Sequence, residues 1–323
     1  MRLLVTGGAG FIGSNYVRRC LGGTLKNISS VTVLDSLTYA GSLTNLADLL
    51  PDPRLNFVEG NVCDLDLVST LVSEVDAIIN FAAESHVDRS IVSASDFILT
   101  NVLGVQIQLE AILNSGGDKR FVQISTDEVY GSIEKDSWDE TAPILPNSPY
   151  SASKAGGELL ARSYFRTHNL DVVITRCSNN YGPNQYPEKL IPLFITNIVE
   201  GKKLPLYGDG RNVRDWLHVD DHCLAIHKVL FNGRSGEAYN IGGGRELSNR
   251  EITNLVIDLM GGSQSSIEHV PDRKGHDFRY SVNWSKINVE LGYEPQVSFE
   301  DGLRSTITWY LNNEPWWRSA KKL

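Results

Sequence analysis

The feature that most constrains the fold is a short apolar run, Leu3–Thr6, that leads directly into a turn with glycines at positions 7, 10 and 13. Glycines at this spacing allow a tight turn and let a helix N-terminus approach a pyrophosphate closely. A glycine trio alone is weak evidence, because many turns are rich in glycine. Here the trio follows a predicted strand and opens a predicted helix. The pattern predicts a dinucleotide site that includes Gly7, Gly10, Phe11, Ile12 and Gly13.

Asp35 indicates which dinucleotide this site would take. It stands at the end of the second apolar run, 22 residues after Gly13. A carboxylate there can accept hydrogen bonds from both ribose hydroxyls of NAD and would repel the extra phosphate of NADP. The alternative is an exposed aspartate that caps a helix. We favour NAD, and we assign the residues after the third and fourth strands more weakly to the adenine and pyrophosphate: Asn61, Val62, Ala82 and Ala83.

Short apolar runs alternate with helix-length amphipathic segments along the first half of the chain. Such alternation predicts parallel strands joined by crossover helices, which is an α/β fold with a Rossmann-like, doubly wound parallel sheet. The predicted strands are Leu3–Thr6, Ser30–Leu34, Leu55–Glu59, Ala77–Phe81, Arg120–Ser125 and Val172–Arg176.

One long helix is predicted between Asp96 and Asn114. Apolar residues recur there at alternating steps of four and three, at Ile98, Val102, Val105, Leu109 and Ile112. This spacing places them on one stripe of a continuous helix. We favour packing of the stripe on the sheet over a dimer seam, although both can hold.

The rhythm of strands and helices becomes irregular after about residue 182, where prolines and a loop-like segment at 207–210 follow. One later segment, Ala238–Ile241, is expected to return to the sheet. We therefore predict an NAD-binding Rossmann domain over residues 1–182, with segments near 215–245 returning to it. Residues 183–323 would form mainly a smaller C-terminal substrate-binding domain, interleaved with the first.

Composition and charge exclude several classes of protein. With 323 residues, 41% of them hydrophobic, the chain can bury a substantial core. A net charge of −9 argues against a main role in binding nucleic acid. Met1 leads straight into the first strand, and no stretch is expected to approach the ~20 apolar residues that span a bilayer. We expect a cytoplasmic protein without a membrane partner. Four scattered cysteines with no CxxC pair predict neither a disulfide framework nor a metal site.

Tyr150 and Lys154 form the first candidate catalytic pair. They stand four residues apart at the start of a helix-like segment, so both project from one face. A nearby ammonium favours the phenolate, so we expect a lowered Tyr150 pKa that suits a base. Such pairs are common on helix surfaces, but one behind a dinucleotide fold and after Ser125-Thr126 is specific. The arrangement is similar to that of the short-chain dehydrogenase/reductase superfamily, and the glycine spacing resembles its extended branch.

Thr126 is followed directly by two carboxylates, Asp127 and Glu128. Simple hydride exchange at a carbinol needs no such pair, whereas a dehydration does. Once C4 of a sugar is a ketone, one carboxylate can remove the acidified C5 proton while a carboxylic acid protonates the departing C6 hydroxyl. Adjacent carboxylates resist both being charged, so we expect a raised pKa at Asp127. The alternative is a pair of acids that cap the next turn.

A collinear set of segments adds to these observations. They are Thr6–Gly13, Leu34–Gly41, Ala82–Ser90, Thr126–Gly131, Tyr150–Lys154, Arg176–Pro183, Pro187–Pro192, Arg214–Trp216 and Asp272–Asp277. Together they resemble the dTDP-glucose 4,6-dehydratase family over nearly the whole chain. One departure is Lys274, where many relatives carry a proline, and it bears on the geometry of the loop near Arg273.

The resemblance implies a role for each matching residue. Tyr150 would be the base for the C4 hydroxyl, Lys154 would hold the nicotinamide ribose, and Thr126 would bind a sugar oxygen. Asp127 would be the acid for the C6 hydroxyl and Glu128 the base at C5. Cys177 and Asn180 would join the cofactor site. The substrate site would comprise Thr126 with Ser85, His86, Asn179, Glu188, Lys189, Leu190, Pro205, Tyr207, Arg214, Asn249, Arg273 and His276.

The implied reaction is the NAD-dependent dehydration of dTDP-glucose to dTDP-4-keto-6-deoxy-glucose. It proceeds by oxidation at C4, loss of the C6 hydroxyl as water across C5–C6, and return of the hydride to C6. The implied partners are this nucleotide sugar and a second copy of the chain in a homodimer. Three alternatives stay open: a nucleotide-sugar 4-epimerase, a dehydratase acting on a UDP- or GDP-sugar, and a non-catalytic NAD-binding regulator.

Overall fold

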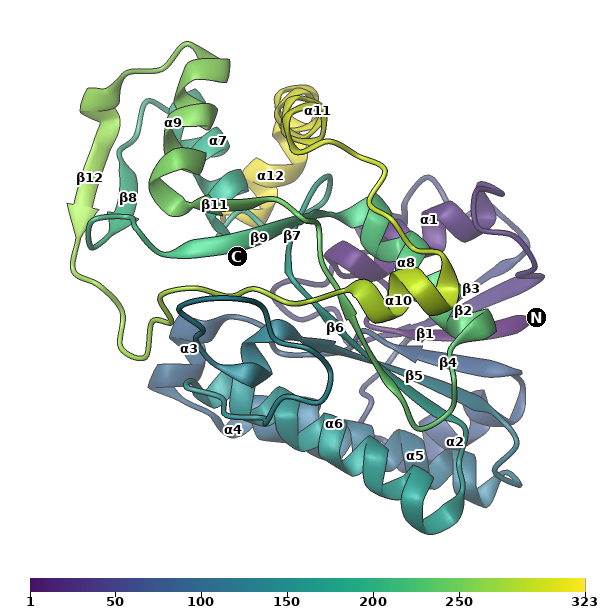
Figure 1. The fold of residues 1–323 in the computed structure, drawn as a ribbon. Helices are drawn as coiled ribbons and strands as arrows, with labels where there is room; N and C mark the ends of the chain where they lie inside the picture. Colours follow the sequence, from purple (N-terminus) through teal and green to yellow (C-terminus); the bar gives the residue numbers. More distant parts are fainter. Residues whose placement is uncertain (323) are drawn as a thin grey trace.

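The centre of the protein is a seven-stranded sheet in which all neighbouring strands run parallel (Figure 1). It comes from a computed structural model that describes residues 1–322. The strands are β1 (Arg2–Thr6), β2 (Ser30–Asp35), β3 (Leu55–Glu59), β4 (Ala77–Asn80), β5 (Arg120–Thr126), β6 (Val172–Cys177) and β10 (Ala238–Ile241). Their order is β10-β6-β5-β4-β1-β2-β3. The doubly wound sheet expected from the sequence is confirmed, and each predicted strand agrees to within one residue at either end.

The order of the strands determines where a ligand can bind. From β1 the chain moves outward through β2 to β3, and it then returns to β4 and continues outward on the other side. The connections after β1 and β4 therefore diverge. A crevice forms at such a switch point, outside the carboxyl ends of the strands.

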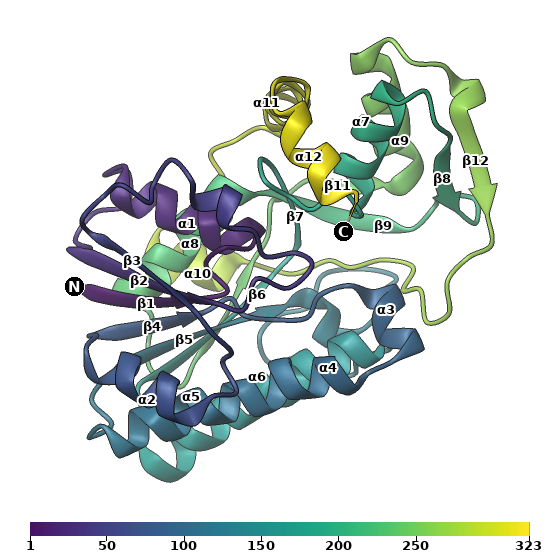
Figure 2. The same cartoon turned by 180° about the vertical axis from the view of Figure 1, so that it is seen from behind.

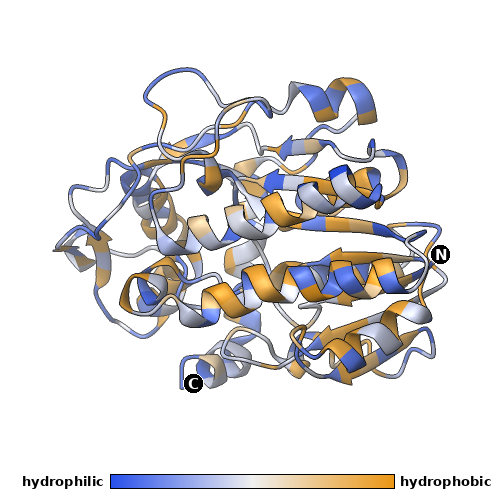
Figure 3. Cartoon of the chain, turned by 90° about the horizontal axis from the view of Figure 1, so that it is seen from below, coloured by the Kyte–Doolittle hydropathy of each residue, from blue (hydrophilic) through white to orange (hydrophobic). Residues whose placement is uncertain are grey.

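Helices cover both faces of the sheet, as the two opposite views show (Figures 1 and 2). One face carries α1 (Phe11–Leu21), α8 (Val219–Asn232) and α10 (Ser285–Leu291), and the other carries α2 (Leu65–Ser73), α5 (Gly104–Asn114) and α6 (Pro149–His168). Side chains along a strand alternate between faces. Leu3 and Val5 accordingly belong to the core on one face and Leu4 to the core on the other, all fully buried. Seen from below, the strands are mostly hydrophobic, whereas the helices in front of them are mixed (Figure 3).

The predicted helix between Asp96 and Asn114 is present but is not uniform. It consists of α4 (Ser95–Ile98), a π-helical segment (Leu99–Leu103) and α5. Val105, Leu109 and Ile112 are fully buried, whereas Ile98 is half exposed. By length and composition alone the stretch Ser95–Asn114 could cross a membrane, so the expectation that no segment approaches that length is wrong. Its buried side packs on α2 and α6, as in the core helix of a globular protein.

A smaller region lies beyond the carboxyl ends of the strands (Figure 1). It contains a three-stranded sheet of β7 (Asn179–Tyr181), β9 (Val213–His218) and β11 (Glu246–Ser248), and a parallel pair of β8 (Leu204–Tyr207) and β12 (Ile267–Val270). Its helices are α7 (Leu190–Val199), α9 (Asn249–Met260), α11 (Phe299–Asn312) and α12 (Glu314–Ala320). The short α3 (Val87–Val92) follows β4, and 3₁₀ turns occur at Leu43–Leu46, Asp127–Tyr130 and Gln264–Ser266. These elements bury a core of their own, which includes Phe194, Ile252 and Trp317.

Candidate active site

A cavity of about 500 Å³ opens between the carboxyl ends of the central strands and the smaller region. Every residue assigned to a site from the sequence lies on its wall. The proposed cofactor residues there are Gly7, Gly10, Phe11, Ile12, Gly13, Asp35, Asn61, Val62, Ala82, Ala83, Cys177 and Asn180, beside Tyr150 and Lys154. The proposed substrate residues are Ser85, His86, Thr126, Asn179, Glu188, Lys189, Leu190, Pro205, Tyr207, Arg214, Asn249, Arg273 and His276, with Asp127 and Glu128 between the two sets. The structure brings all of them together, while their individual roles stay predictions.

The turn after β1 requires glycine because its backbone lies against other backbone atoms. Gly7 adopts a φ of +69°, and a Cβ atom there would lie 2.5 Å from the backbone nitrogen of Ala82. A Cβ atom at Gly13 would lie 2.4 Å from the carbonyl oxygen of Gly7. Helix α1 begins at Phe11, and Gly10, its N-cap, makes no side-chain capping bond. Glycine has no side chain that could cap the first N–H groups of α1, which fits a pyrophosphate at this position.

The Asp35 carboxylate is fixed at the end of β2. Its Oδ2 accepts the N–H of Ala9 and its Oδ1 accepts the N–H of Leu37, each at 2.9 Å. Burial raises the pKa of Asp35, and these two hydrogen bonds oppose the rise. Each oxygen retains a lone pair for a further donor. This geometry suits a carboxylate that receives ribose hydroxyls.

Helix α6 positions Tyr150 and Lys154 in its first turns. The helix begins with a capping box between Ser148 and Ser151, with Pro149 at its first position. Lys154 Nζ donates to the carbonyl oxygen of Ile124 at 2.6 Å, and burial lowers the Lys154 pKa to about 8.

The expectation that Lys154 lowers the pKa of Tyr150 is wrong for this structure. Burial, followed by the charge of Glu128, raises the Tyr150 pKa well above its usual value, and a hydrogen bond with Thr126 opposes the rise. The ammonium of Lys154 is instead directed to the Ile124 carbonyl. The loss of hydration of the phenolate is therefore the dominant effect at Tyr150.

Asp127 lies in the 3₁₀ turn that directly follows β5, and it is only 3% exposed. Thr126 donates its hydroxyl to Asp127 Oδ1 at 3.2 Å, whereas Oδ2 has no hydrogen-bond partner within residues 1–322. Burial, followed by the charges of Glu128 and Asp215, raises the Asp127 pKa well above its usual value. The rise in the Asp127 pKa is in the direction expected from the sequence. It favours a protonated Asp127 that can donate a proton.

Glu128 is the neighbouring carboxylate, and its surroundings differ. Burial raises its pKa, but the charges of Arg273, Arg214 and Lys189 oppose that rise. These three cations stabilise the ionised form. The turn thus holds two adjacent carboxyl groups with different charged neighbours, the pattern that separates an acid from a base.

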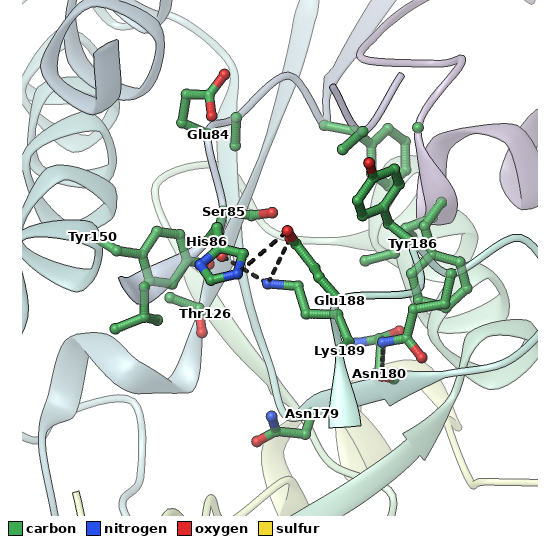
Figure 4. Close-up of a pocket in the computed structure, with 18 of the residues that line it drawn as sticks. Glu84, Ser85, His86, Thr126, Tyr150, Asn179, Asn180, Tyr186, Glu188 and Lys189 are labelled. Atoms are coloured by element: carbon green, nitrogen blue, oxygen red, sulfur yellow. Dashed lines mark hydrogen bonds and ion pairs between the residues drawn. The ribbon is translucent and has the colours of Figure 1, made fainter. Parts of the chain in front are cut away.

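A second charged cluster surrounds Glu188 on the cavity wall (Figure 4). His86 Nε2 lies 3.3 Å from Glu188 Oε2, and Lys189 Nζ lies 3.8 Å from Glu188 Oε1. Lys189 Nζ also donates to the carbonyl oxygen of Ser85 at 3.0 Å. Burial and the charge of Lys189 lower the His86 pKa to about 4. His86 is therefore neutral at physiological pH.

The smaller region contributes two arginines to the wall. Arg214 on β9 donates from Nη1 to the carbonyl oxygen of Val213 at 2.7 Å. Arg273 Nε has no hydrogen-bond partner within the described residues, and its Nη1 lies 4.0 Å from Asp88 Oδ1. A guanidinium with a buried, unpaired donor is suited to phosphate oxygens. Lys274 is exposed, so this departure from the family pattern does not remove Arg273 from the cavity.

Sequence reasoning assigned no role to several residues that the fold brings to the site. Thr100, Tyr186, Phe194 and Trp216 line the cavity. Tyr280 lies behind Glu128, with its hydroxyl 3.4 Å from Glu128 Oε2. Such residues come from separate elements and share no local pattern, so only the tertiary structure reveals them.

A metal centre has no obvious place in the described part of the chain. Within residues 1–322 no group of three or more His, Cys, Asp or Glu side chains could hold a metal ion. The four cysteines are free.

Comparisons with known proteins agree with this site. The family described as GDP-mannose 4,6 dehydratase matches residues 4–306. The dTDP-glucose 4,6-dehydratase of Streptomyces niveus is 56% identical, over 99% of this chain and 96% of that protein. The crystal structure of DesIV, a dTDP-glucose 4,6-dehydratase from Streptomyces venezuelae with NAD and TYD bound, has a TM-score of 0.98 and 58% identity, covering 99% of this chain and 100% of that chain.

An epimerase is similar in fold but more distant in sequence. UDP-glucose 4-epimerase of Thermotoga maritima has a TM-score of 0.89 at 29% identity, and 97% of this chain and 100% of that chain are covered. The dehydratase interpretation thus holds over the epimerase alternative. The chain belongs to the dTDP-glucose 4,6-dehydratase family.

Proposed function

We propose that this protein is an NAD-dependent hydro-lyase that converts dTDP-glucose to dTDP-4-keto-6-deoxy-glucose. The observation that carries the proposal is the pair of adjacent carboxyl groups, Asp127 and Glu128, on the same cavity wall as Tyr150 and Lys154. A 4-epimerase oxidises and reduces C4 and has no use for this acid pair. When bound, NAD would supply the acceptor for the hydride from C4 and the same hydride for C6.

The oxidation step would use the residues at the start of α6 and the end of β5. Tyr150 accepts the proton of the C4 hydroxyl, and Thr126 bonds a sugar oxygen. Lys154 holds the nicotinamide ribose from the position fixed by its hydrogen bond to Ile124. Correct placement of reacting groups accounts for a large part of the rate in such sites.

The elimination step would divide its work between the two carboxyl groups. Glu128, whose ionised form is stabilised by three cations, removes the proton at C5. Asp127, whose protonated form is favoured by burial, donates its proton to the C6 hydroxyl. The C5–H and C6–O bonds break, a C5–C6 double bond forms, and water leaves.

The nucleotide of the substrate is proposed on two grounds. The similar proteins named above are dTDP-glucose 4,6-dehydratases, and one was solved with NAD and TYD bound. The cavity also offers Lys189, Arg214 and Arg273 to a diphosphate. Charge-assisted hydrogen bonds from these groups would hold phosphate oxygens.

A direct test incubates the purified protein with dTDP-glucose, without added coenzyme, and follows the alkali-labile chromophore of a 4-keto sugar. The expected result is product formation without net release of reduced coenzyme. UDP-glucose, GDP-glucose and GDP-mannose serve as competing substrates. A preference for GDP-mannose, or sustained stoichiometric release of NADH, would contradict the proposal.

The same proposal extends to the organisation of the chain. Residues 1–182, with segments near 215–245, would form the NAD-binding domain, and residues 183–323 mainly the substrate-binding domain. The placement of β10 at the edge of the central sheet supports the interleaving. Four free cysteines and the nucleotide substrates support a cytoplasmic location.

A homodimer is the proposed assembly. The exposed apolar side chains around α4 support it: Ile98 and Leu99 are each 50% exposed, and Leu103 is 39% exposed. An exposed apolar patch on such a helix fits a second copy of the chain. Sedimentation of the Leu103→Glu variant would show half the parental mass, and a parental monomer would contradict the proposal.

A further inference from the structure

Tyr280 contacts Glu128, and Asp277 contacts Tyr280. The Tyr280 hydroxyl oxygen lies 2.6 Å from Asp277 Oδ2 but 3.4 Å from Glu128 Oε2. Both residues are buried, with Tyr280 3% and Asp277 5% exposed. A tyrosine has a single hydroxyl hydrogen, and the shorter contact has the length of a strong charge-assisted bond. The hydrogen therefore points to Asp277 and away from Glu128.

Both carboxylate oxygens and the main-chain oxygen of Asp277 accept hydrogen bonds. Asn147 donates its amide to Asp277 Oδ1 at 2.7 Å, so each carboxylate oxygen accepts one hydrogen bond. The main-chain oxygen of Asp277 accepts Arg214 Nη2 at 3.0 Å and Asn212 Nδ2 at 3.2 Å. These contacts connect the loop of Asp277 to the arginine on β9. The carboxylate therefore accepts one hydrogen bond from Asn147 and one from Tyr280.

The direction of that hydrogen affects the basicity of Glu128. A donor to a carboxylate stabilises its ionised form and makes it a weaker base. Arg273, Arg214 and Lys189 already act in this direction, whereas burial and the charge of Asp277 act against it. The other titratable groups that face Glu128 are Asp127, Tyr150 and Tyr280. A further donor from Tyr280 would reduce the affinity of Glu128 for a proton.

We propose that Asp277 is a positioning residue for the elimination step. It accepts the hydrogen bond of the Tyr280 hydroxyl, so that this hydroxyl does not donate to Glu128, and the Glu128 carboxylate stays free to remove a proton from carbon. The proposal rests on the proposed function, because it assumes that Glu128 is the base at C5. Asp277 does not itself have to reach the substrate. It acts through Tyr280 and through its charge.

The test compares single-turnover kinetics of the parent protein, Asp277→Ala, Asp277→Asn, Tyr280→Phe and Tyr280→Phe/Asp277→Ala across pH, with dTDP-glucose as substrate. In Asp277→Ala the Tyr280 hydrogen turns to Glu128. The elimination rate should fall by up to about tenfold at neutral pH, the upper limit for about one unit of lost basicity. The acidic limb of the pH profile of elimination should move to lower pH, while the rate of C4 oxidation stays unchanged. Exchange of the C5 hydrogen with deuterated solvent should slow in parallel.

Two further variants separate a direct effect from a loss of structure. Asp277→Asn keeps an acceptor for Tyr280 but loses the charge, so its acidic limb should move in the same direction by less. In the Tyr280→Phe background, Asp277→Ala should have a smaller effect than in the parent, because no hydroxyl hydrogen can be redirected. Rapid C4 oxidation in each variant shows that it is folded.

Three results would overturn the proposal. The first is an Asp277→Ala pH–rate profile whose acidic limb matches that of the parent, and the second is an equal effect of Asp277→Ala with and without Tyr280. The third, if the alanine variant does not fold, is an acidic limb in Asp277→Asn that matches that of the parent. A parent protein that does not dehydrate dTDP-glucose would instead refute the proposed function. The two failures are therefore distinguishable.

Discussion

Gly13→Ala adds one methyl group at the most crowded position of the glycine turn. The new Cβ would lie 2.4 Å from Gly7 O and 2.8 Å from Gly8 Cα, whereas ordinary contact begins at 3.4 Å. Both neighbours are backbone atoms, so α1 has to move by the difference of 1.0 Å from Gly7 O (3.4 minus 2.4). Overpacking of this kind costs about 1–3 kcal/mol, and the helix propensity of alanine returns about 1 kcal/mol. We expect a net loss of about 1 kcal/mol, or about 1–2 °C in Tm for a chain of this length.

The same shift moves the N-terminus of α1 away from the proposed pyrophosphate, so the purified variant should contain less than one NAD per chain. Gly156→Ala is the matched control, because it also lies within a helix but its Cβ would meet only the side chain of Val102, at 3.2 Å. It should keep its NAD and gain up to about 1 kcal/mol. Thermal unfolding and NAD release on denaturation measure both quantities. A Gly13→Ala protein as stable and as rich in NAD as Gly156→Ala would refute this reasoning.

Two further predictions concern the α6 pair. Tyr150→Phe should lower kcat by at least about 10²-fold, because no group remains to accept the C4 proton, and near-parental turnover would require another base, with His86 the next candidate. Burial lowers the Lys154 pKa to about 8 from 10.5, so below pH 8 the folded protein holds a proton less readily than the unfolded chain does. Lys154→Met should therefore stabilise the NAD-free protein by about 2 kcal/mol at pH 7. The pKa difference contributes about 3 kcal/mol, and the lost hydrogen bond removes about 1 kcal/mol of it. The part of the gain that comes from the charge should disappear between pH 8 and 10.5; denaturant unfolding at several pH values tests this, and a difference independent of pH would contradict it.

The fold could be predicted because its signals are local. Buried parallel strands appear as short apolar runs, and the turn after β1 needs glycine for steric reasons that operate within a few residues. The helix at Ser95–Asn114 was predicted in extent, but its π-helical segment, Leu99–Leu103, was not. A π-helical segment depends on packing against other elements, and the periodicity of apolar residues does not predict it.

The site could be predicted as a set of residues but not as a set of interactions. Tyr150 and Lys154 were placed on one helix face by their spacing, yet the pKa of Tyr150 depends on burial, which sequence spacing does not give. The contact between Asp277 and Tyr280 is local in sequence, whereas their approach to Glu128 joins positions 152 residues apart. No local pattern indicates that approach.

The central claim is that Asp127 and Glu128 perform the elimination and take no part in the oxidation. Single-turnover absorbance of the reduced nicotinamide, recorded after mixing Asp127→Asn or Glu128→Gln with dTDP-glucose, tests it most directly. The account predicts that both variants oxidise C4, accumulate enzyme-bound NADH and fail to form the 4-keto-6-deoxy product. Variants that form no NADH would place these carboxyl groups in the oxidation step, and variants that dehydrate at the parental rate would contradict the account.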